Sequence, residues 1–212
     1  MGKCIVFCAG DFNGLLEPIN PGDLVIAADG GLRHVVKLGV KPEVILGDFD
    51  SLGYIPDGSE VFPCEKDDTD AMLAVRYGLK SGYREFIIYG GLDGPRLEHT
   101  VANFQTLIFL AEHGARGTLV GCNQIVSVLA SGEMLFPDTA KGYVSVFCMG
   151  QDAVGVDLEG LYYPMANGTL TAGFPLGVSN RFIGKKAHIR LRSGYLLVIW
   201  DRMNGMPQII SE

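Results

Sequence analysis

Residues 24–31 read LVIAADGG, and residues 44–51 read VILGDFDS. Each stretch is a short apolar run that ends in acidic residues and glycine. Runs of this length, rich in β-branched residues, are typical of buried strands, while the glycines and aspartates that follow are typical of turns. The two stretches therefore predict buried strands whose carboxyl ends carry carboxylates.

Further strand candidates lie on both sides of these two within the first 120 residues. They are residues 4–8, 60–62, 85–89 and 118–120. Between them, residues 70–79 and 97–113 carry apolar side chains three and four positions apart, which is the period of a helix. Alternation of strands and helices predicts an α/β fold with a Rossmann-like, mostly parallel sheet covered by helices.

The pattern changes after about residue 121. Strand candidates now follow one another between glycine, proline, asparagine and aspartate turns, at residues 125–129, 143–148, 154–158, 168–172, 187–191 and 195–200. Short strands at this spacing predict an antiparallel β-sandwich. We therefore expect an α/β domain at residues 1–124 and a β-sandwich domain at residues 125–212.

The composition excludes several classes of protein. The 212 residues include 24 acidic and 17 basic side chains, a net charge of −7, with 48% hydrophobic and 19% charged residues. Such a chain is too apolar to be disordered, and its acidic balance argues against binding nucleic acid. No apolar run approaches the ~20 residues that span a bilayer. The five scattered cysteines favour neither a disulfide framework nor a zinc site, and they fit a reducing cytoplasm.

Carboxylates or paired glycines follow five successive strand candidates, at residues 9–11, 29–31, 47–51, 65–70 and 90–94. Ligands of an open parallel sheet bind beyond the carboxyl ends of its strands, so these segments are expected to meet at one edge. Carboxylates brought together repel one another, and Mg²⁺ compensates them while also binding phosphate oxygens. The pattern therefore predicts a metal and phosphate site, with Asp48 and Asp50 as its strongest signal.

Each of these features also has an ordinary structural interpretation. Asp-Gly and Gly-Gly pairs are common in turns, and the acidic residues at 67–70 could complement the start of a helix.

The basic residues near this edge, Lys66, Arg96 and Arg33, suit phosphate oxygens. His99 could either support the site or only contact the start of its helix. No GxxxxGK[ST] element is present and no GxGxxG follows the first strand, which argues against a P-loop enzyme and a dinucleotide dehydrogenase.

Six motifs together resemble the thiamine pyrophosphokinase (thiamine diphosphokinase) family. Four lie in the first half, at residues 27–31, 38–43, 47–51 and 66–70, and two lie in the second half, at residues 159–165 and 171–180. The resemblance implies an enzyme that transfers pyrophosphate from ATP to the hydroxyethyl group of thiamine, giving thiamine diphosphate and AMP, with Mg²⁺. It also implies a homodimer whose active site lies between the α/β domain of one subunit and the sandwich of the other.

The resemblance further implies roles for single residues. The catalytic residues would be Asp48, Asp50 and Asp70, which with Glu98 would also be the metal ligands. Contacts to ATP would come from Asp29, Gly30, Gly31, Lys66, Thr69 and Arg96. Thiamine would contact Ser179, Asn180 and the ring of Tyr163, where an aromatic face suits the cationic thiazolium. Near residue 91 the chain departs from the family pattern, being one residue longer and having Glu98 in place of aspartate.

Two other functions are compatible with part of this pattern. A haloacid-dehalogenase-type phosphatase would use the Asp48-x-Asp50 element as its nucleophile motif, although Asp48 follows the third strand candidate and not the first. A non-catalytic module could bind the nucleotide or thiamine without turnover. For the transfer itself, a carboxylate of the sheet edge, Asp70 among others, could accept the proton of the attacking hydroxyl.

Overall fold

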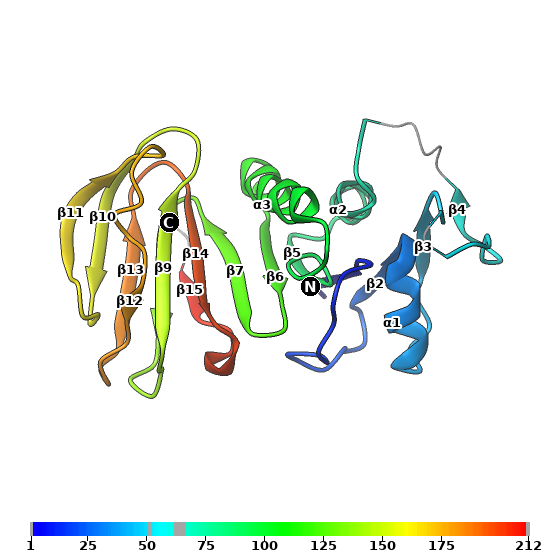
Figure 1. The fold of residues 1–212 in the computed structure, drawn as a ribbon, viewed down its shortest axis with the longest axis horizontal. Helices are drawn as coiled ribbons and strands as arrows, with labels where there is room; N and C mark the ends of the chain where they lie inside the picture. The colour runs from blue at the N-terminus through cyan, green and yellow to red at the C-terminus, as the bar shows by residue number, and fades with distance from the viewer. Residues whose placement is uncertain (1, 51, 62–66, 211–212) are drawn as a thin grey trace. The chain divides into compact units, whose positions relative to one another are not determined.

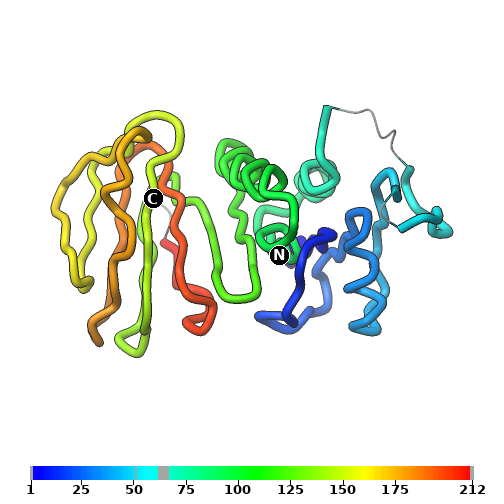
Figure 2. Tube along the Cα trace, in the orientation of Figure 1, coloured from blue at the N-terminus to red at the C-terminus, as the bar shows by residue number. Residues whose placement is uncertain are grey.

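The structure is a computed structural model that describes residues 2–50, 52–61 and 67–210. The chain forms two compact units, Met1–Cys122 and Asn123–Glu212. Figure 2 shows that the chain completes the first unit before it enters the second. The separate roles expected for residues 1–124 and 125–212 stay predictions.

The first unit is built on a parallel sheet, as predicted (Figure 1). Its strands are β1 (Cys4–Phe7), β2 (Leu24–Ala28), β3 (Val44–Gly47), β4 (Glu60–Val61), β5 (Glu85–Tyr89) and β6 (Arg116–Val120). Their order in the sheet is β6-β5-β1-β2-β3-β4, and every neighbouring pair is parallel. β1 and β2 are buried along their whole length, which explains their continuous apolar sequences.

Helices cover this sheet. They are α1 (Leu32–Lys37), α2 (Asp70–Lys80) and α3 (Leu97–Glu112), and a short 3₁₀ turn at Asp29–Gly31 precedes α1. α2 packs on β1, β2 and β3 and also against α3. Gly78 permits this close approach, because a Cβ there would lie 2.7 Å from the Cys4 Sγ and 2.6 Å from the Phe86 ring. Six-residue α1 was not predicted, since it is too short to display a helical period.

The second unit consists of two antiparallel sheets. Its strands are β7 (Gln124–Leu129), β8 (Gly132–Phe136), β9 (Tyr143–Cys148), β10 (Ala153–Glu159), β11 (Met165–Leu170), β12 (Asn180–Arg181), β13 (Ala187–Leu191), β14 (Leu196–Asp201) and β15 (Gln208–Ile210). One sheet has the order β12-β9-β14-β7, and the other has the order β11-β10-β13-β8-β15. The strands β8, β12 and β15 were not predicted.

Aromatic side chains join the two sheets of the second unit. The ring centroid of Phe136 on β8 lies 5.7 Å from that of Trp200 on β14 and 5.1 Å from that of Phe182. Trp200 is fully buried, and its indole N–H donates to the Gly205 carbonyl at 2.8 Å. The α/β unit followed by a two-sheet antiparallel unit confirms the predicted fold class.

Two further observations concern the described residues alone. None of their helices is long and apolar enough to cross a membrane. Cys4, Cys8, Cys122 and Cys148 form no disulfide with one another, and Cys64 lies outside the described residues.

Candidate active site

The carboxyl ends of the parallel strands surround a cavity of about 440 Å³ within the first unit. Such a volume lies within the ~300–1,000 Å³ typical of small-ligand pockets. The lining comes from the segments after β1, β2, β3 and β5, from the start of α2, and from the first turns of α3. The strand ends meet at one edge, as the order of the parallel sheet requires.

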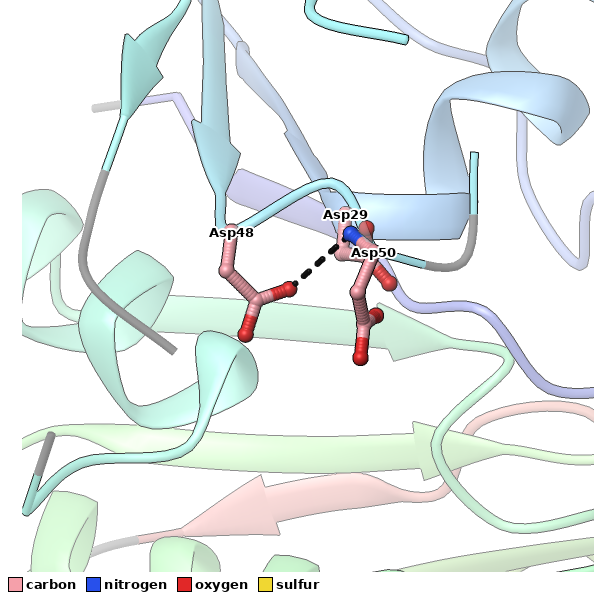
Figure 3. A group of neighbouring side chains, drawn as sticks. All are labelled: Asp29, Asp48 and Asp50. Carbon is pink, nitrogen blue, oxygen red and sulfur yellow. Dashed lines mark hydrogen bonds between the residues drawn. The ribbon is translucent and has the colours of Figure 1, made fainter. Parts of the chain in front are cut away.

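Three aspartates form a compact group in this cavity (Figure 3). Asp29 follows β2, whereas Asp48 and Asp50 follow β3. Each contributes one carboxylate oxygen to a set in which all atoms lie within 4.8 Å of one another. Asp29 is buried, Asp48 is half-buried and Asp50 is exposed, so the group reaches from the sheet edge into open space.

Local backbone conformation brings these side chains together. Asp29 and the buried Phe49 both adopt left-handed conformations, with φ of 47° and 59°. Non-glycine residues hold such conformations at a cost of about 1–3 kcal/mol, and they cluster at functional sites. The N–H of Asp50 donates to the Asp48 Oδ1 at 3.2 Å, which fixes the turn (Figure 3). Glycine is favoured at position 47, because its φ is 148° and a Cβ there would lie 3.0 Å from the Cα of Asp29.

The donor set fits a hard divalent cation. All three groups are carboxylates, the ligand type that Mg²⁺ prefers, and none of them is a nitrogen or sulfur ligand. Negative charges at this separation repel, and a cation would offset that repulsion. The open side of the group leaves room for phosphate oxygens as further ligands.

Asp70 lines the same cavity but is not one of the group of three. It is the first residue of α2, where the Thr69 side chain accepts a hydrogen bond from the Met72 N–H at 3.2 Å. Asp70 also lies near Cys8: burial, and secondly the negative charge of Asp70, raises the pKa of the Cys8 thiol to about 12. Asp70 is therefore held at the edge of the cavity by the first turn of a helix.

Arg96 and Glu98 form an ion pair at the mouth of the site. The Arg96 Nε donates to the Glu98 Oε1 at 2.8 Å, and both side chains are 66% exposed. This hydrogen bond holds the pKa of the Glu98 carboxyl below its usual range. Arg96 lines the cavity, whereas Glu98 is absent from its described lining. A metal-binding role for Glu98 stays a prediction.

Gly30 and Gly31 are buried in the 3₁₀ turn and do not belong to the described lining of the cavity. A Cβ on Gly31 would lie 1.9 Å from the Phe7 carbonyl oxygen, so this glycine permits close packing of the turn on β1. Lys66, which was predicted to bind ATP, lies outside the described residues. Its role stays a prediction.

Two polar residues of the cavity were missed. Thr100 and Asn103 on α3 line it beside His99, and Asn103 is a buried residue. The available signal was a pair of polar side chains three positions apart in the first half of the helix. Their partners are backbone carbonyls of the preceding loop, which residue types alone do not reveal.

In the second unit the predicted thiamine contacts lie close together. The Asn180 Oδ1 accepts from the Tyr163 N–H at 2.9 Å, and the Asn180 Nδ2 donates to the Tyr163 carbonyl at 2.7 Å. Buried Asn180 thus fixes the backbone of Tyr163, whose ring is exposed. Ser179 has a φ of 58°, and its N–H donates to the Ser145 Oγ at 2.9 Å. Exposed apolar side chains gather in the same segments: Tyr162, Phe174, Leu176 and Val178.

Comparisons with known proteins identify the family. The sequence matches "Thiamin pyrophosphokinase, catalytic domain" over residues 17–118 and "Thiamin pyrophosphokinase, vitamin B1 binding domain" over residues 134–196. A thiamine pyrophosphokinase from Bacillus subtilis (strain 168) is 27% identical over 185 residues, which cover 83% of this chain and 86% of that protein.

Solved structures agree with this result. The crystal structure of thiamine pyrophosphokinase from Bacillus subtilis has a TM-score of 0.79 at 24% identity, covering 93% of this chain and 97% of that one. The enzyme from Geobacillus thermodenitrificans has a TM-score of 0.74 at 25% identity, covering 94% and 96%. Because the two matched regions follow one another along a chain with this fold, the protein belongs to the thiamine pyrophosphokinase family, whose members form thiamine diphosphate.

Proposed function

We propose that this protein transfers the pyrophosphoryl group of ATP to the hydroxyethyl group of thiamine, giving thiamine diphosphate and AMP. The observation that carries the proposal is the group of Asp29, Asp48 and Asp50, whose oxygens lie within 4.8 Å of one another in a cavity of the catalytic-domain region. Carboxylates gathered in this way suit a metal-bound triphosphate better than they suit a neutral ligand.

Several residues of the cavity have a part in this proposal. Asp29, Asp48 and Asp50 would hold Mg²⁺, which when bound offsets the charge of the phosphate oxygens. Arg96 offers a guanidinium fork to phosphate oxygens, and Glu98 restrains that guanidinium from outside. Thr69 caps the helix that presents Asp70.

The transfer forms one phosphorus–oxygen bond and breaks another. The hydroxyl oxygen of thiamine attacks the β-phosphorus of ATP, and the bond from this phosphorus to the α,β-bridging oxygen breaks. AMP leaves with the bridging oxygen and its electron pair. Asp70 at the start of α2 is our candidate to accept the proton released by the hydroxyl. In this chemistry the residues contribute mainly positioning and charge neutralisation.

The thiamine-binding role falls to the second unit. We assign thiamine to the surface around Tyr163, Ser179 and Asn180, which lies within residues 134–196 of the vitamin B1 binding match. The exposed Tyr163 ring offers a face to the thiazolium cation, and the Asn180 amide holds that residue in place. We further propose a homodimer in which this surface completes the cavity of the partner subunit.

The alternative functions receive less support. A haloacid-dehalogenase-type phosphatase is not favoured, because both matched regions belong to thiamine pyrophosphokinase. A non-catalytic module would not need three convergent carboxylates to bind thiamine. The cytoplasmic location expected from the cysteines stays a prediction.

The test supplies purified protein with ATP, thiamine and Mg²⁺ and separates the products by chromatography. We expect AMP and thiamine diphosphate in equal amounts, with neither formed when EDTA is added. Formation of ADP and thiamine monophosphate would show transfer of a single phosphoryl group instead. Release of inorganic phosphate without thiamine would support the phosphatase, and binding without any product would support the module.

A further inference from the structure

We propose that Thr100 and Asn103 on α3 are positioning residues for the nucleotide: they fix Gly91 and Leu92, in the loop that forms a wall of the cavity, and so set the affinity for ATP. The inference rests on the proposed function, since it takes the cavity to hold the triphosphate. Neither side chain is assigned a role in proton transfer or in binding the metal.

The first observation is a continuous set of hydrogen bonds to the loop after β5. Four successive carbonyl oxygens, those of residues 90–93, each accept one bond. Asn103 Nδ2 donates to Gly91 at 2.7 Å, and Thr100 Oγ1 donates to Leu92 at 2.9 Å. Backbone N–H groups of the β1 loop donate to the other two, at residues 90 and 93, each at 2.9 Å.

The second observation is the close contact between the loop and the segment after β1. A Cβ on Gly10 would lie 2.1 Å from the Asp93 carbonyl oxygen and 2.6 Å from that of Gly90. The Asp93 carboxylate also accepts from the Cys122 N–H at 2.5 Å. Backbone groups therefore hold the loop where it faces the segment after β1. Where it faces α3, the side chains of Thr100 and Asn103 hold it.

These bonds matter for an anionic ligand. A carbonyl oxygen turned into the cavity would repel phosphate oxygens, and each of the four carbonyls is instead held by a donor. Among the described residues, the backbone N–H groups of residues 91–94 donate no hydrogen bond within the protein. Successive N–H groups of this kind are the donors that loops commonly offer to phosphates.

The third observation is the burial of Asn103. The other buried residues of α3 are Thr106, Leu107 and Leu110, which pack as ordinary core residues, and an apolar side chain at position 103 would meet the needs of packing alone. A buried amide is costly unless it is hydrogen-bonded, and this one bonds the loop. Loop position, and not helix packing, therefore accounts for its polarity.

The test compares two threonine variants of the same helix in the full-length protein. Thr100→Val removes the hydroxyl that holds Leu92, whereas Thr106→Val removes a buried hydroxyl whose one bond among the described residues goes to the Ala102 carbonyl of its own helix, at 3.1 Å. We expect Thr100→Val to raise the KM for ATP about three- to tenfold, the value of one hydrogen bond, with less than about a twofold change in the KM for thiamine. Thr106→Val should leave both values within about twofold of the wild type.

Two further variants sharpen the result. Thr100→Ser keeps the hydroxyl and should restore the KM for ATP to near the wild-type value. Asn103→Leu keeps the volume of the side chain but loses the donor to the Gly91 carbonyl. It should raise the KM for ATP more than Thr100→Val does. Thermal unfolding is recorded for every variant, so that the KM values of folded proteins are compared, and the threonine pair decides the matter if Asn103→Leu does not fold.

The wild-type protein separates this inference from the proposed function. If wild-type protein forms AMP and Thr100→Val has an unchanged KM for ATP, the positioning role is wrong while the function stands. If wild-type protein forms no AMP, the function is wrong, and the thermal shift on adding Mg²⁺ and ATP becomes the readout for the loop. An equal loss of ATP affinity in Thr100→Val and Thr106→Val would show that both residues act only through the general stability of the protein. That result would overturn the inference.

Discussion

Asp48 is the residue on which the proposed metal site depends most directly. It is half-buried, its Oδ1 accepts from the Asp50 N–H at 3.2 Å, and its carboxylate belongs to the group of three. We expect Asp48→Asn to lower the rate of AMP formation by about a hundredfold or more, because a charge that stabilises the transferred phosphates is lost. The fold should persist, since replacing one of three repelling carboxylates relieves repulsion.

Thermal unfolding with and without Mg²⁺ checks this prediction alongside the rate. Wild-type protein should gain stability from Mg²⁺ and ATP, and Asp48→Asn should lose most of that gain. Asp57→Asn is a matched control, because Asp57 is exposed in the same unit and does not belong to the described lining of the cavity. Retained activity in Asp48→Asn would remove Asp48 from the site.

Cys8 makes the free energy of unfolding depend on pH in the alkaline range. Its thiol has a pKa of about 12 in the folded protein, raised by burial and by the charge of Asp70, against an ordinary value of 9.0. Between these values the unfolded chain binds fewer protons than the folded one, so the free energy of unfolding falls as the pH rises from 9 towards 12. Below pH 9 the contribution of the protonated Cys8 thiol to the free energy of unfolding is fully present.

Urea unfolding at a series of pH values measures this effect. In Cys8→Ala the free energy of unfolding should fall less steeply above pH 9 than in the wild-type protein, because the variant has no thiol to ionise at this position. Equal slopes for the two proteins would show that the Cys8 thiol ionises alike in the folded and unfolded states.

The start of α2 links the stability of a helix to the geometry of the cavity. Thr69 caps this helix, and Asp70 is its first residue. We expect Thr69→Ala to lower the free energy of unfolding by about 1 kcal/mol, the usual value of such a cap. Fraying of the first turn would move Asp70, so kcat should fall as well.

Thr69→Ser and Ser81→Ala are the controls for the cap. Serine keeps the capping oxygen and should preserve both stability and kcat. Ser81 lies at the other end of α2, and its replacement should leave kcat unchanged. A normal kcat in Thr69→Ala would show that Asp70 does not depend on the capped turn.

The same elements show what residue patterns can predict. β2, β5, β9 and β13 have the predicted bounds, because burial on one or both faces requires continuous or alternating apolar residues. Two-residue β12 and three-residue β15 are too short to show any such period. They form through pairing with strands that are distant in sequence.

The site, too, has residues that a sequence pattern predicts and contacts that it does not. Asp48 and Asp50 could be predicted because they directly follow a buried strand, and the end of such a strand has a known place in a parallel sheet. Asp29 joins them through the order of β2 and β3. The hydrogen bond from Asn103 to the Gly91 carbonyl could not be predicted, since it depends on where a loop carbonyl points.

The proposed division of the active site between two subunits makes the assembly itself testable. The three aspartates of the proposed metal site belong to the first unit, and Tyr163 belongs to the second. If each site combines the first unit of one subunit with the second unit of its partner, a defect in either unit disables both sites of a homodimer. In a mixed dimer of two different variants, however, both defects fall in one site and the other site is intact.

We therefore expect Asp48→Asn and Tyr163→Ala, each nearly inactive alone, to regain about a quarter of wild-type activity when mixed in equal amounts and allowed to exchange subunits, because half of the dimers are then mixed and half of their sites are intact. Asp48→Asn mixed with Asp50→Asn is the control and should stay inactive, since both defects lie in the same unit. Mass spectrometry of intact dimers would establish that subunits have exchanged. Mixed dimers without recovered activity would place the aspartates and Tyr163 of each site in a single subunit, and an active protein that sediments as a monomer would contradict the shared site altogether.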